Sequence, residues 1–153
     1  MSFLIRQVEA GDLTGVYAIE KECFHDPYPI EFLEHLIKTE NSRFYVATQA
    51  GRIVGYAVAT ASGREGHVVS VAVDPSHRRM GMGAGLLASV TCKLVEAGVD
   101  RIHLEVRKGN RSAIFFYERM GFQRFSEIKR YYPDGEDAWV LTRQAESSHS
   151  EYQ

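Results

Sequence analysis

A glycine-rich segment that follows a short apolar strand constrains this chain more than any other feature. The strand is expected over 67–73 and ends at Asp74-Pro75, and residues 78–85 then read Arg-Arg-Met-Gly-Met-Gly-Ala-Gly. Alternating glycines let several backbone N–H groups point outward together. At a helix N-terminus such donors and the helix dipole form an anion site. Because Arg78 and Arg79 add two guanidinium groups at its mouth, the segment predicts a phosphate or diphosphate ligand.

Other interpretations of this glycine-rich segment stay open from the residues alone. A P-loop requires Lys-Ser or Lys-Thr after its glycines, and neither follows here. A dinucleotide-binding fingerprint can be aligned with residues 83–88, but a long loop separates those glycines from Val73, where that motif requires a tight turn. A flexible loop before a glycine-rich helix start is the remaining alternative.

Hydrophobic periodicity predicts strands and helices in the order β-α-α-β-β-β-α-β-α-β-β. The strands are expected over 3–8, 44–48, 53–58, 67–73, 101–106, 122–131 and 138–142, and the helices over 12–24, 30–37, 86–97 and 113–120. Strands and helices alternate in the second half of the chain. This pattern favours the α/β (α+β) class, with a mixed sheet and helices on both faces.

Size and composition bound the rest. The 153 residues suit one domain, expected over 1–143, and the polar residues 144–153 are expected to form a disordered tail. A formal net charge of −2 offers no overall basic field for nucleic acid or a membrane surface. Cys23 and Cys92 show no metal-ligand spacing, so no metal is expected. Without a signal-peptide pattern or a long apolar run, we expect a reduced, cytoplasmic protein with no membrane partner and no nucleic-acid substrate.

At this point the residues resemble a known family. The run Ser70-Val71-Ala72-Val73-Asp74-Pro75, followed by Arg78-x-x-Gly81-x-Gly83, resembles the acyl-CoA-binding signature of the GNAT superfamily of N-acetyltransferases. Leu104-Glu105-Val106-Arg107, Asn110 and residues 116–122 extend the match. Residues 131–138, Tyr-Tyr-Pro-Asp-Gly-Glu-Asp-Ala, resemble the branch that acetylates protein N-termini, which includes ribosomal-protein alanine N-acetyltransferases and archaeal NatA-type catalytic subunits.

This resemblance implies a single-domain GNAT fold with a twisted, mostly antiparallel mixed sheet. It implies acetyl-CoA as cosubstrate, no metal, and direct attack by the acceptor in a ternary complex. The acceptor would be the α-amino group of a protein or peptide, with ribosomal proteins or the ribosome as possible partners. Two rivals remain open: acetylation of a small-molecule amine, and a CoA-binding module without catalysis.

Acetyl transfer to an amine needs a base, because an α-amino group has a pKa of ~7.7–8.0 and is mostly protonated near pH 7. The resemblance implies that Glu105 is this base, that His67 shares the duty, and that Tyr117 protonates the leaving thiolate. The structural alternatives are a solvent-facing strand Glu, a strand-end His and a core Tyr. We expect no role for His77 or His103.

The donor site implied by the resemblance lies on the strand, the turn and the following helices. Backbone groups of a strand that splays from its neighbour at a bulge would hold the pantetheine arm. The residues expected to bind the cofactor are Val71, Ala72, Val73, Arg78, Arg79, Met80, Gly81, Met82, Gly83, Ala84, Asn110 and Tyr117.

The acceptor site implied by the resemblance lies between two loops, 24–29 and 130–133. Tyr28, Tyr131 and Tyr132 are expected to bind an extended peptide backbone through their hydroxyl groups. The Leu-Pro-Glu-Asn-Tyr loop of eukaryotic relatives is replaced here by Phe24-His25-Asp26-Pro27-Tyr28. This departure leaves the preferred first residue of the acceptor open.

Overall fold

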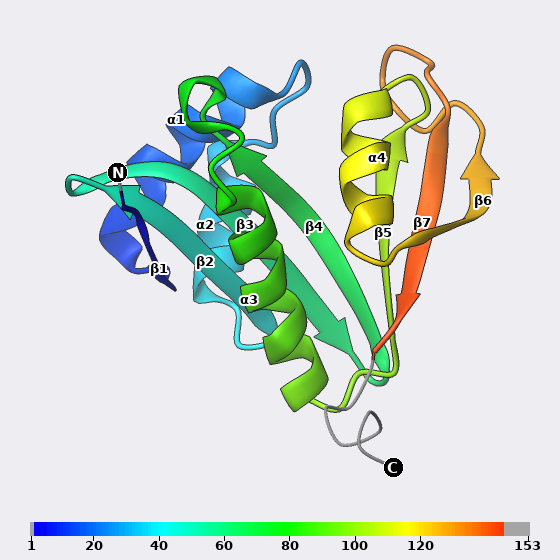
Figure 1. Ribbon diagram of the computed structural model, residues 1–153, viewed down its shortest axis with the longest axis horizontal. Helices are drawn as coiled ribbons and strands as arrows, with labels where there is room; N and C mark the ends of the chain where they lie inside the picture. The colour runs from blue at the N-terminus through cyan, green and yellow to red at the C-terminus, as the bar shows by residue number, and fades with distance from the viewer. Residues whose placement is uncertain (1, 146–153) are drawn as a thin grey trace.

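The structure is a computed structural model that describes residues 2–145 (Figure 1). Within this range the elements, in chain order, are β1 (Leu4–Gln7), α1 (Leu13–Cys23), α2 (Ile30–Lys38), β2 (Ser42–Gln49), β3 (Arg52–Ser62), β4 (Glu65–Val73), α3 (Met82–Glu96), β5 (Arg101–Arg107), α4 (Arg111–Arg119), β6 (Gln123–Ile128) and β7 (Ala138–Gln144). Two short 3-10 turns, Ala10–Asp12 and Pro75–His77, precede α1 and α3. The predicted order of strands and helices is confirmed.

The strands form one seven-stranded sheet in the order β1-β2-β3-β4-β5-β7-β6. Every neighbouring pair is antiparallel except β4 and β5, which are parallel. This confirms a mixed, mostly antiparallel sheet. The helix α3 connects the two parallel strands, as a crossover between parallel strands requires (Figure 1).

Both faces of the sheet are covered by helices. On one face Val16 and Ile19 of α1 and Leu33 and Leu36 of α2 pack against the buried strand residue Tyr56. On the other face the apolar side of α3 forms a larger core with Ile114 of α4 and with β5. The expectation of helices on both faces of the sheet is therefore confirmed.

The β2–β3 hairpin has a two-residue turn. Ala50 and Gly51 both adopt positive φ, at 52° and 78°. A turn of this kind matches the twist of the strands that it joins, and glycine takes such a conformation without steric cost. The hairpin then continues as two long strands, of which β3 reaches Ser62, four residues beyond the predicted end.

Three predicted boundaries need correction. The helix α3 begins at Met82 and not at residue 86, because the glycines themselves form its first turn. The strand β6 ends at Ile128, and the chain then loops to β7. The expected disordered tail does not begin at Gln144. This residue is the last of β7 and pairs with Arg101 of β5, and the N–H of Ala145 donates to the carbonyl of Asp100. The rest of that expected tail, residues 146–153, lies outside the described residues.

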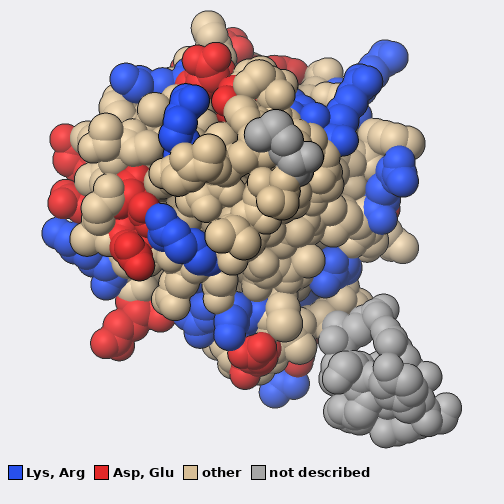
Figure 2. Space-filling view, turned by 60° about the vertical axis from the view of Figure 1, so that its left-hand side comes forward, with Lys and Arg blue, Asp and Glu red and all other residues tan. Residues whose placement is uncertain are grey.

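The surface carries charges of both signs. On the face drawn in Figure 2, Lys and Arg side chains alternate with Asp and Glu side chains around a broad uncharged area. Among the helices of residues 2–145, none is both long enough and apolar enough to cross a bilayer.

Candidate active site

The two parallel strands part along their length. Pairing between β4 and β5 covers only three rungs, the last of which is His67 with His103. Beyond this rung β4 carries a bulge, because Val58 and Ala59 of β3 face Ser70 and Val68 and leave Val69 between them. Figure 1 shows the two strands diverging toward the carboxyl end of β4. Val71, Ala72 and Val73 therefore pair with β3 alone, which is the splay that the sequence implied.

The glycine-rich turn lies at the open end of this splay. Gly81 precedes the first residue of α3 with φ at +80°, and no side chain caps this helix end. The first N–H groups of a helix have no partner within the helix. A Cβ at Gly83 would meet only ordinary contacts, the nearest at 3.6 Å from the Phe116 ring. The turn therefore offers free backbone donors at a positive helix end, which fit a diphosphate.

The side chains of this turn contribute less than the sequence suggested. Arg78 Nε donates to the carbonyl oxygen of Val73 at 3.1 Å, and that same oxygen accepts from the thiol of Cys23 at 3.3 Å. Arg78 is thus folded against β4. Met82 is 1% exposed and belongs to the core, so that only its backbone can face a ligand. Arg79 and Met80 are exposed.

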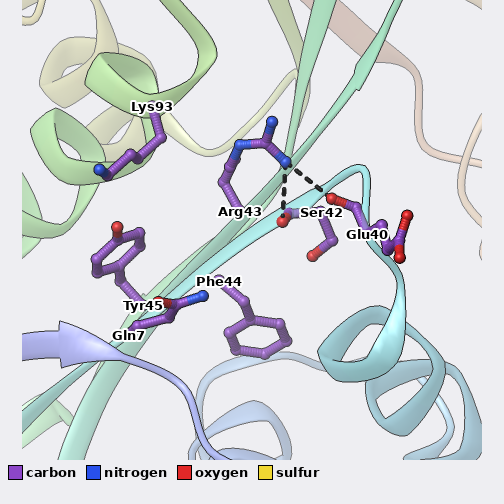
Figure 3. A pocket seen from close by; sticks show the side chains of 7 residues that line it. All are labelled: Gln7, Glu40, Ser42, Arg43, Phe44, Tyr45 and Lys93. Atoms are coloured by element: carbon purple, nitrogen blue, oxygen red, sulfur yellow. Dashed lines mark hydrogen bonds between the residues drawn. The ribbon is translucent and has the colours of Figure 1, made fainter. Parts of the chain in front are cut away.

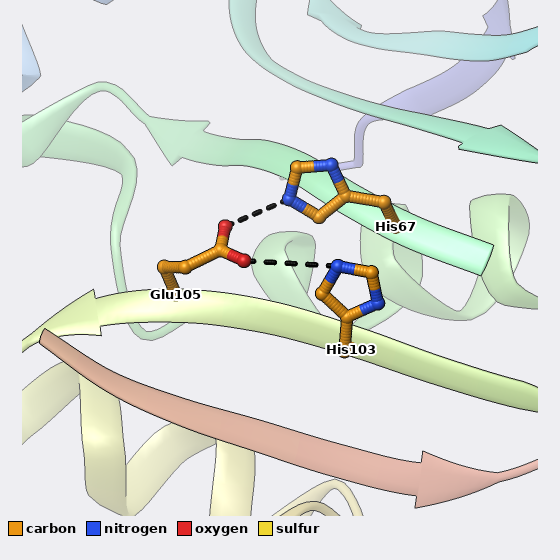
Figure 4. A group of neighbouring side chains, drawn as sticks. All are labelled: His67, His103 and Glu105. Atoms are coloured by element: carbon orange, nitrogen blue, oxygen red, sulfur yellow. Dashed lines mark hydrogen bonds and ion pairs between the residues drawn. The ribbon is translucent and has the colours of Figure 1, made fainter. Parts of the chain in front are cut away.

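Three side chains meet beside the last rung between β4 and β5, and Figure 4 shows the Glu105 carboxylate between the two histidines. His67 Nε2 donates to Glu105 Oε1 at 2.7 Å, and His103 Nε2 lies 3.7 Å from Glu105 Oε2. The two imidazole rings stack with centroids 4.6 Å apart. On its other side, His103 Nδ1 lies 2.6 Å from Glu65 Oε2. The structure therefore joins Glu105 and His67, as predicted, and adds two residues to which the sequence analysis assigned no function.

Glu105 is mostly buried, with 16% of its side chain exposed. Burial by itself would raise the pKa of this carboxyl group, but the hydrogen bond from His67 and the charges of His67 and His103 outweigh it and hold the pKa below its ordinary value. Glu105 is therefore a carboxylate at neutral pH, able to accept a proton but not to retain it.

Tyr117 lies on α4, where its ring contacts Phe116 and Phe122 at centroid distances of 5.1 and 5.9 Å. Burial raises the pKa of its phenol above the ordinary value. The group is therefore protonated at neutral pH, as an acid must be. Asn110 precedes the same helix, and its side-chain oxygen accepts from the N–H of Ala113 at 3.2 Å, which is a helix N-cap.

The two predicted acceptor loops also approach Glu105. Burial raises the pKa of Tyr28 to about 12, with further contributions from the charges of Tyr131, Glu20 and Glu105. The pKa values of Tyr131 and Tyr132 are also raised, first by burial, and Glu105 contributes to both shifts. Three tyrosines from two distant loops thus lie within the electrostatic reach of one carboxylate.

Arg107, at the end of β5, connects these loops. Its guanidinium group donates to Asp26 Oδ2 at 2.8 Å in the first loop, and to Asp134 Oδ2 and Glu136 Oε1 at 2.9 Å in the second. It also lies 4.1 Å from the centroid of the Tyr132 ring. In the sequence, Arg107 appears only as part of a motif. Its role in joining the loops could not be predicted, because its partners are far apart in the chain.

Glu20 is a second residue whose function sequence analysis missed. It lies on the buried side of α1, is 1% exposed, and accepts the hydroxyl of Tyr56 and the N–H of Tyr28, the latter at 2.8 Å. An acid among apolar residues at helical spacing was the available signal. Its contact with Tyr28 holds the first acceptor loop in place. The ring of His77, by contrast, contacts its near neighbours Asp74 and Ser76 at the 3-10 turn.

A surface hollow lies away from this cluster. It has a volume of about 300 Å³ and is formed by β1, β2 and the end of α3. Its lining residues are Gln7, Glu40, Ser42, Arg43, Phe44, Tyr45 and Lys93 (Figure 3). Arg43 there donates to the carbonyls of Glu40 and Ser42. This hollow contains none of the predicted site residues.

Known proteins resemble this chain over nearly its whole length. An N-alpha-acetyltransferase of Sulfurisphaera tokodaii is 31% identical, with 91% of each chain covered. A ribosomal protein bS18 alanine N-acetyltransferase of Escherichia coli K12 is 32% identical, with 90% of this chain and 94% of the relative covered. The crystal structure of Ard1 from Thermoplasma volcanium superposes with a TM-score of 0.89 at 30% identity, covering 96% of this chain and all of the other.

The model of the acetyltransferase (GNAT) family matches residues 13–122, from the start of α1 to the residue before β6. This range contains the glycine turn, the splayed strands and the Glu105 cluster. The expected fold and the expected use of acetyl-CoA as acetyl donor are thereby confirmed. With the family model and these relatives in agreement, the chain belongs to the GNAT family of acetyltransferases.

Proposed function

We propose that this acetyltransferase acts on the α-amino group of protein N-termini. The observation that carries the proposal is the position of Glu105. It accepts a hydrogen bond from His67 at 2.7 Å and contributes to the pKa shifts of Tyr28, Tyr131 and Tyr132, which come from two separate loops. Hydroxyl groups around a base suit an extended backbone that ends in an amine, because each can bond a peptide group.

Each residue of the cluster then has a distinct task. Glu105 accepts a proton from the attacking amine, directly or through a water molecule, and the hydrogen bond from His67 lowers its pKa, so that it does not keep this proton. Tyr117 stays protonated and can donate to a leaving thiolate. Acetyl-CoA, when bound, supplies the activated acetyl group as a thioester.

The donor would be held by backbone groups. The uncapped start of α3 would bind the diphosphate, and the unpaired edge of β4 near Val71 and Ala72 would bind the pantetheine arm. The relatives support a protein acceptor, since the Escherichia coli relative is named for an alanine of ribosomal protein bS18. Ribosomal proteins are therefore the first acceptors to test.

The test is a competition between classes of amine. Release of CoA would be measured with short peptides of varied first residue, with the same peptides blocked at the N-terminus, and with polyamines, amino acids and aminoglycosides. We expect turnover of free peptides and none of blocked peptides that retain an internal lysine. Faster turnover of any small amine than of every peptide would overturn the proposal.

A further inference from the structure

Two residues outside the proposed base pair form a continuous path of titratable groups to the surface. The path runs from His67 through Glu105 and His103 to Glu65, with contacts of 2.7, 3.7 and 2.6 Å, and Figure 4 draws its first three members. Each oxygen of Glu105 thus faces one imidazole nitrogen. The exposed fraction of the side chain rises along the outer part, from 16% for Glu105 to 26% for His103 and 36% for Glu65.

The hydrogen-bond chemistry of His103 defines what this path can carry. A carboxylate only accepts hydrogen bonds, so the contact with Glu65 requires a proton on Nδ1 of His103. In a neutral ring Nε2 is then a bare acceptor that faces a second acceptor, Glu105 Oε2, which agrees with their separation of 3.7 Å. A ring that takes a second proton on Nε2 becomes a donor to both carboxylates. His103 is therefore a place for the proton that Glu105 cannot keep.

The reaction creates the need for such a path. When an ammonium nitrogen becomes an amide nitrogen, an N–C bond forms, the C–S bond breaks, and the nitrogen loses two protons. One proton ends on the thiol and the other must reach the solvent. Because the hydrogen bond from His67 and the charges of both histidines lower the pKa of Glu105 despite its burial, the carboxylate hands this proton on.

We propose that His103, held by Glu65, carries the reaction proton from Glu105 to solvent and positions the Glu105 carboxylate for the attacking amine. This inference rests on the proposed role of Glu105 as base, and it assigns His103 and Glu65 as positioning residues. The other charged group at the outer end is Arg101, whose Nε lies 3.3 Å from Glu65 Oε1. Arg101 orients Glu65 without lying on the path.

A bound metal ion is the competing use of the same atoms. The ligand atoms of His67, His103 and Glu105 all lie within 4.8 Å of one another. The two rings, however, are stacked with an interplanar angle of only 9°, and each nitrogen faces its own oxygen of Glu105. Nitrogens directed side by side serve two separate hydrogen bonds better than they converge on one ion.

The experiment compares His103→Gln and Glu65→Gln with His35→Gln, a matched change at an exposed histidine of α2. Each would be assayed with whichever amine the wild-type protein acetylates. A wrong assignment of the acceptor as a protein N-terminus can thus be distinguished from a wrong assignment of the proton relay through His103. For His103→Gln we expect kcat to fall about tenfold at low buffer concentration, with both KM values within about twofold and partial recovery on addition of imidazole. Glu65→Gln should show a smaller loss, and His35→Gln none.

Two outcomes would overturn the relay. One is a kcat of His103→Gln equal to wild type at every pH. The other is a loss in His103→Gln that imidazole does not restore and that accompanies a lowered melting temperature, together with a wild-type kcat in Glu65→Gln, at a more exposed site. Treatment of the wild type with a chelator should leave its activity unchanged. Loss of activity that Zn²⁺ restores would assign the cluster to a metal instead.

Discussion

The proposed donor and acceptor sides of this site are built in opposite ways. The proposed donor side, between Val71 and Ala84, is one continuous stretch of chain whose strand edge and helix start would act through the backbone. The acceptor side consists of side chains from segments far apart in sequence, joined by Arg107 to Asp26, Asp134 and Glu136. A site made of backbone groups tolerates substitution of the surrounding side chains. A site made of side chains from distant segments depends on each ion pair that holds those segments together. The two sides should therefore respond differently to substitution.

Glu105 lies where the two sides meet, and its loss should have the largest effect. Glu105→Gln keeps the size of the side chain but removes the proton acceptor. We expect kcat to fall about a hundredfold or more, with both KM values little changed. Steady-state kinetics measures this, with Glu31→Gln on the exposed side of α2 as the matched control. A loss of less than about threefold would remove Glu105 from the base role.

Substitution of Arg107, which disrupts the acceptor side alone, should have the next largest effect. Arg107→Ala removes both loop ties and leaves Asp26, Asp134 and Glu136 facing one another without a cation. We expect the KM for peptide to rise about tenfold, roughly 1.4 kcal/mol, while the KM for acetyl-CoA stays unchanged. The KM for peptide of Arg107→Lys should lie between the values of the wild type and of Arg107→Ala, since an ammonium group keeps the charge but lacks the guanidinium fork.

The control for Arg107 is Arg52→Ala, at an exposed arginine of β3. An equal rise in the KM for acetyl-CoA would show that the two sides are not independent.

The donor side can be tested by adding one methyl group. A Cβ at Gly83 meets ordinary contacts, so Gly83→Ala should fold with an unchanged or slightly higher melting temperature. The methyl group would crowd the proposed diphosphate position. We expect the KM for acetyl-CoA to rise about fivefold, the equivalent of about one lost hydrogen bond, with the KM for peptide unchanged.

Gly11→Ala is the matched control, because a Cβ there meets nothing within 4 Å. If Gly83→Ala bound acetyl-CoA as tightly as wild type, the diphosphate would have to lie elsewhere.

Lowering the pH should produce the smallest of these differences between the two sides, seen in their rates of hydrogen exchange. Hydrogen bonds from the Glu136 N–H and from Arg107 hold the pKa of Asp134 below its ordinary value. A hydrogen bond from the Arg130 N–H and the charge of Lys129 lower the pKa of Asp137 in the same way. Partial desolvation opposes both shifts. A lowered pKa contributes stability above the ordinary value of ~3.9, which is lost as the pH falls through the lower folded value. Hydrogen exchange, corrected for its intrinsic pH dependence, should therefore quicken severalfold in residues 129–137 below about pH 4 but not in residues 79–85. Equal quickening in both segments would contradict the comparison.

Much of the fold follows from local patterns in the chain. Apolar residues at helical spacing in α1, α2 and α3, and the positive-φ turn at Gly51, predicted elements that the structure confirms to within a few residues. The errors lie at ends: α3 begins four residues earlier than predicted, and Gln144 belongs to β7. End positions depend on tertiary pairing, as the position of Gln144 opposite Arg101 of β5 illustrates.

The candidate site divides in the same way. The glycine turn was predicted because a motif is a property of a short stretch of chain, and a shared role of Glu105 and His67 was implied by the family resemblance. His103, Glu65, Arg107 and Glu20 were not, because each acts through a partner from another element.

By itself the sequence determined the order of elements, the family and the donor turn, because short-range periodicity and backbone conformation depend on neighbouring residues. Only the tertiary structure decided that two histidines stack at the last rung between β4 and β5, and that one arginine joins two loops. The physical reason is that hydrogen bonds and ion pairs act over a few ångströms. Side chains tens of residues apart acquire these partners only when the sheet brings them together.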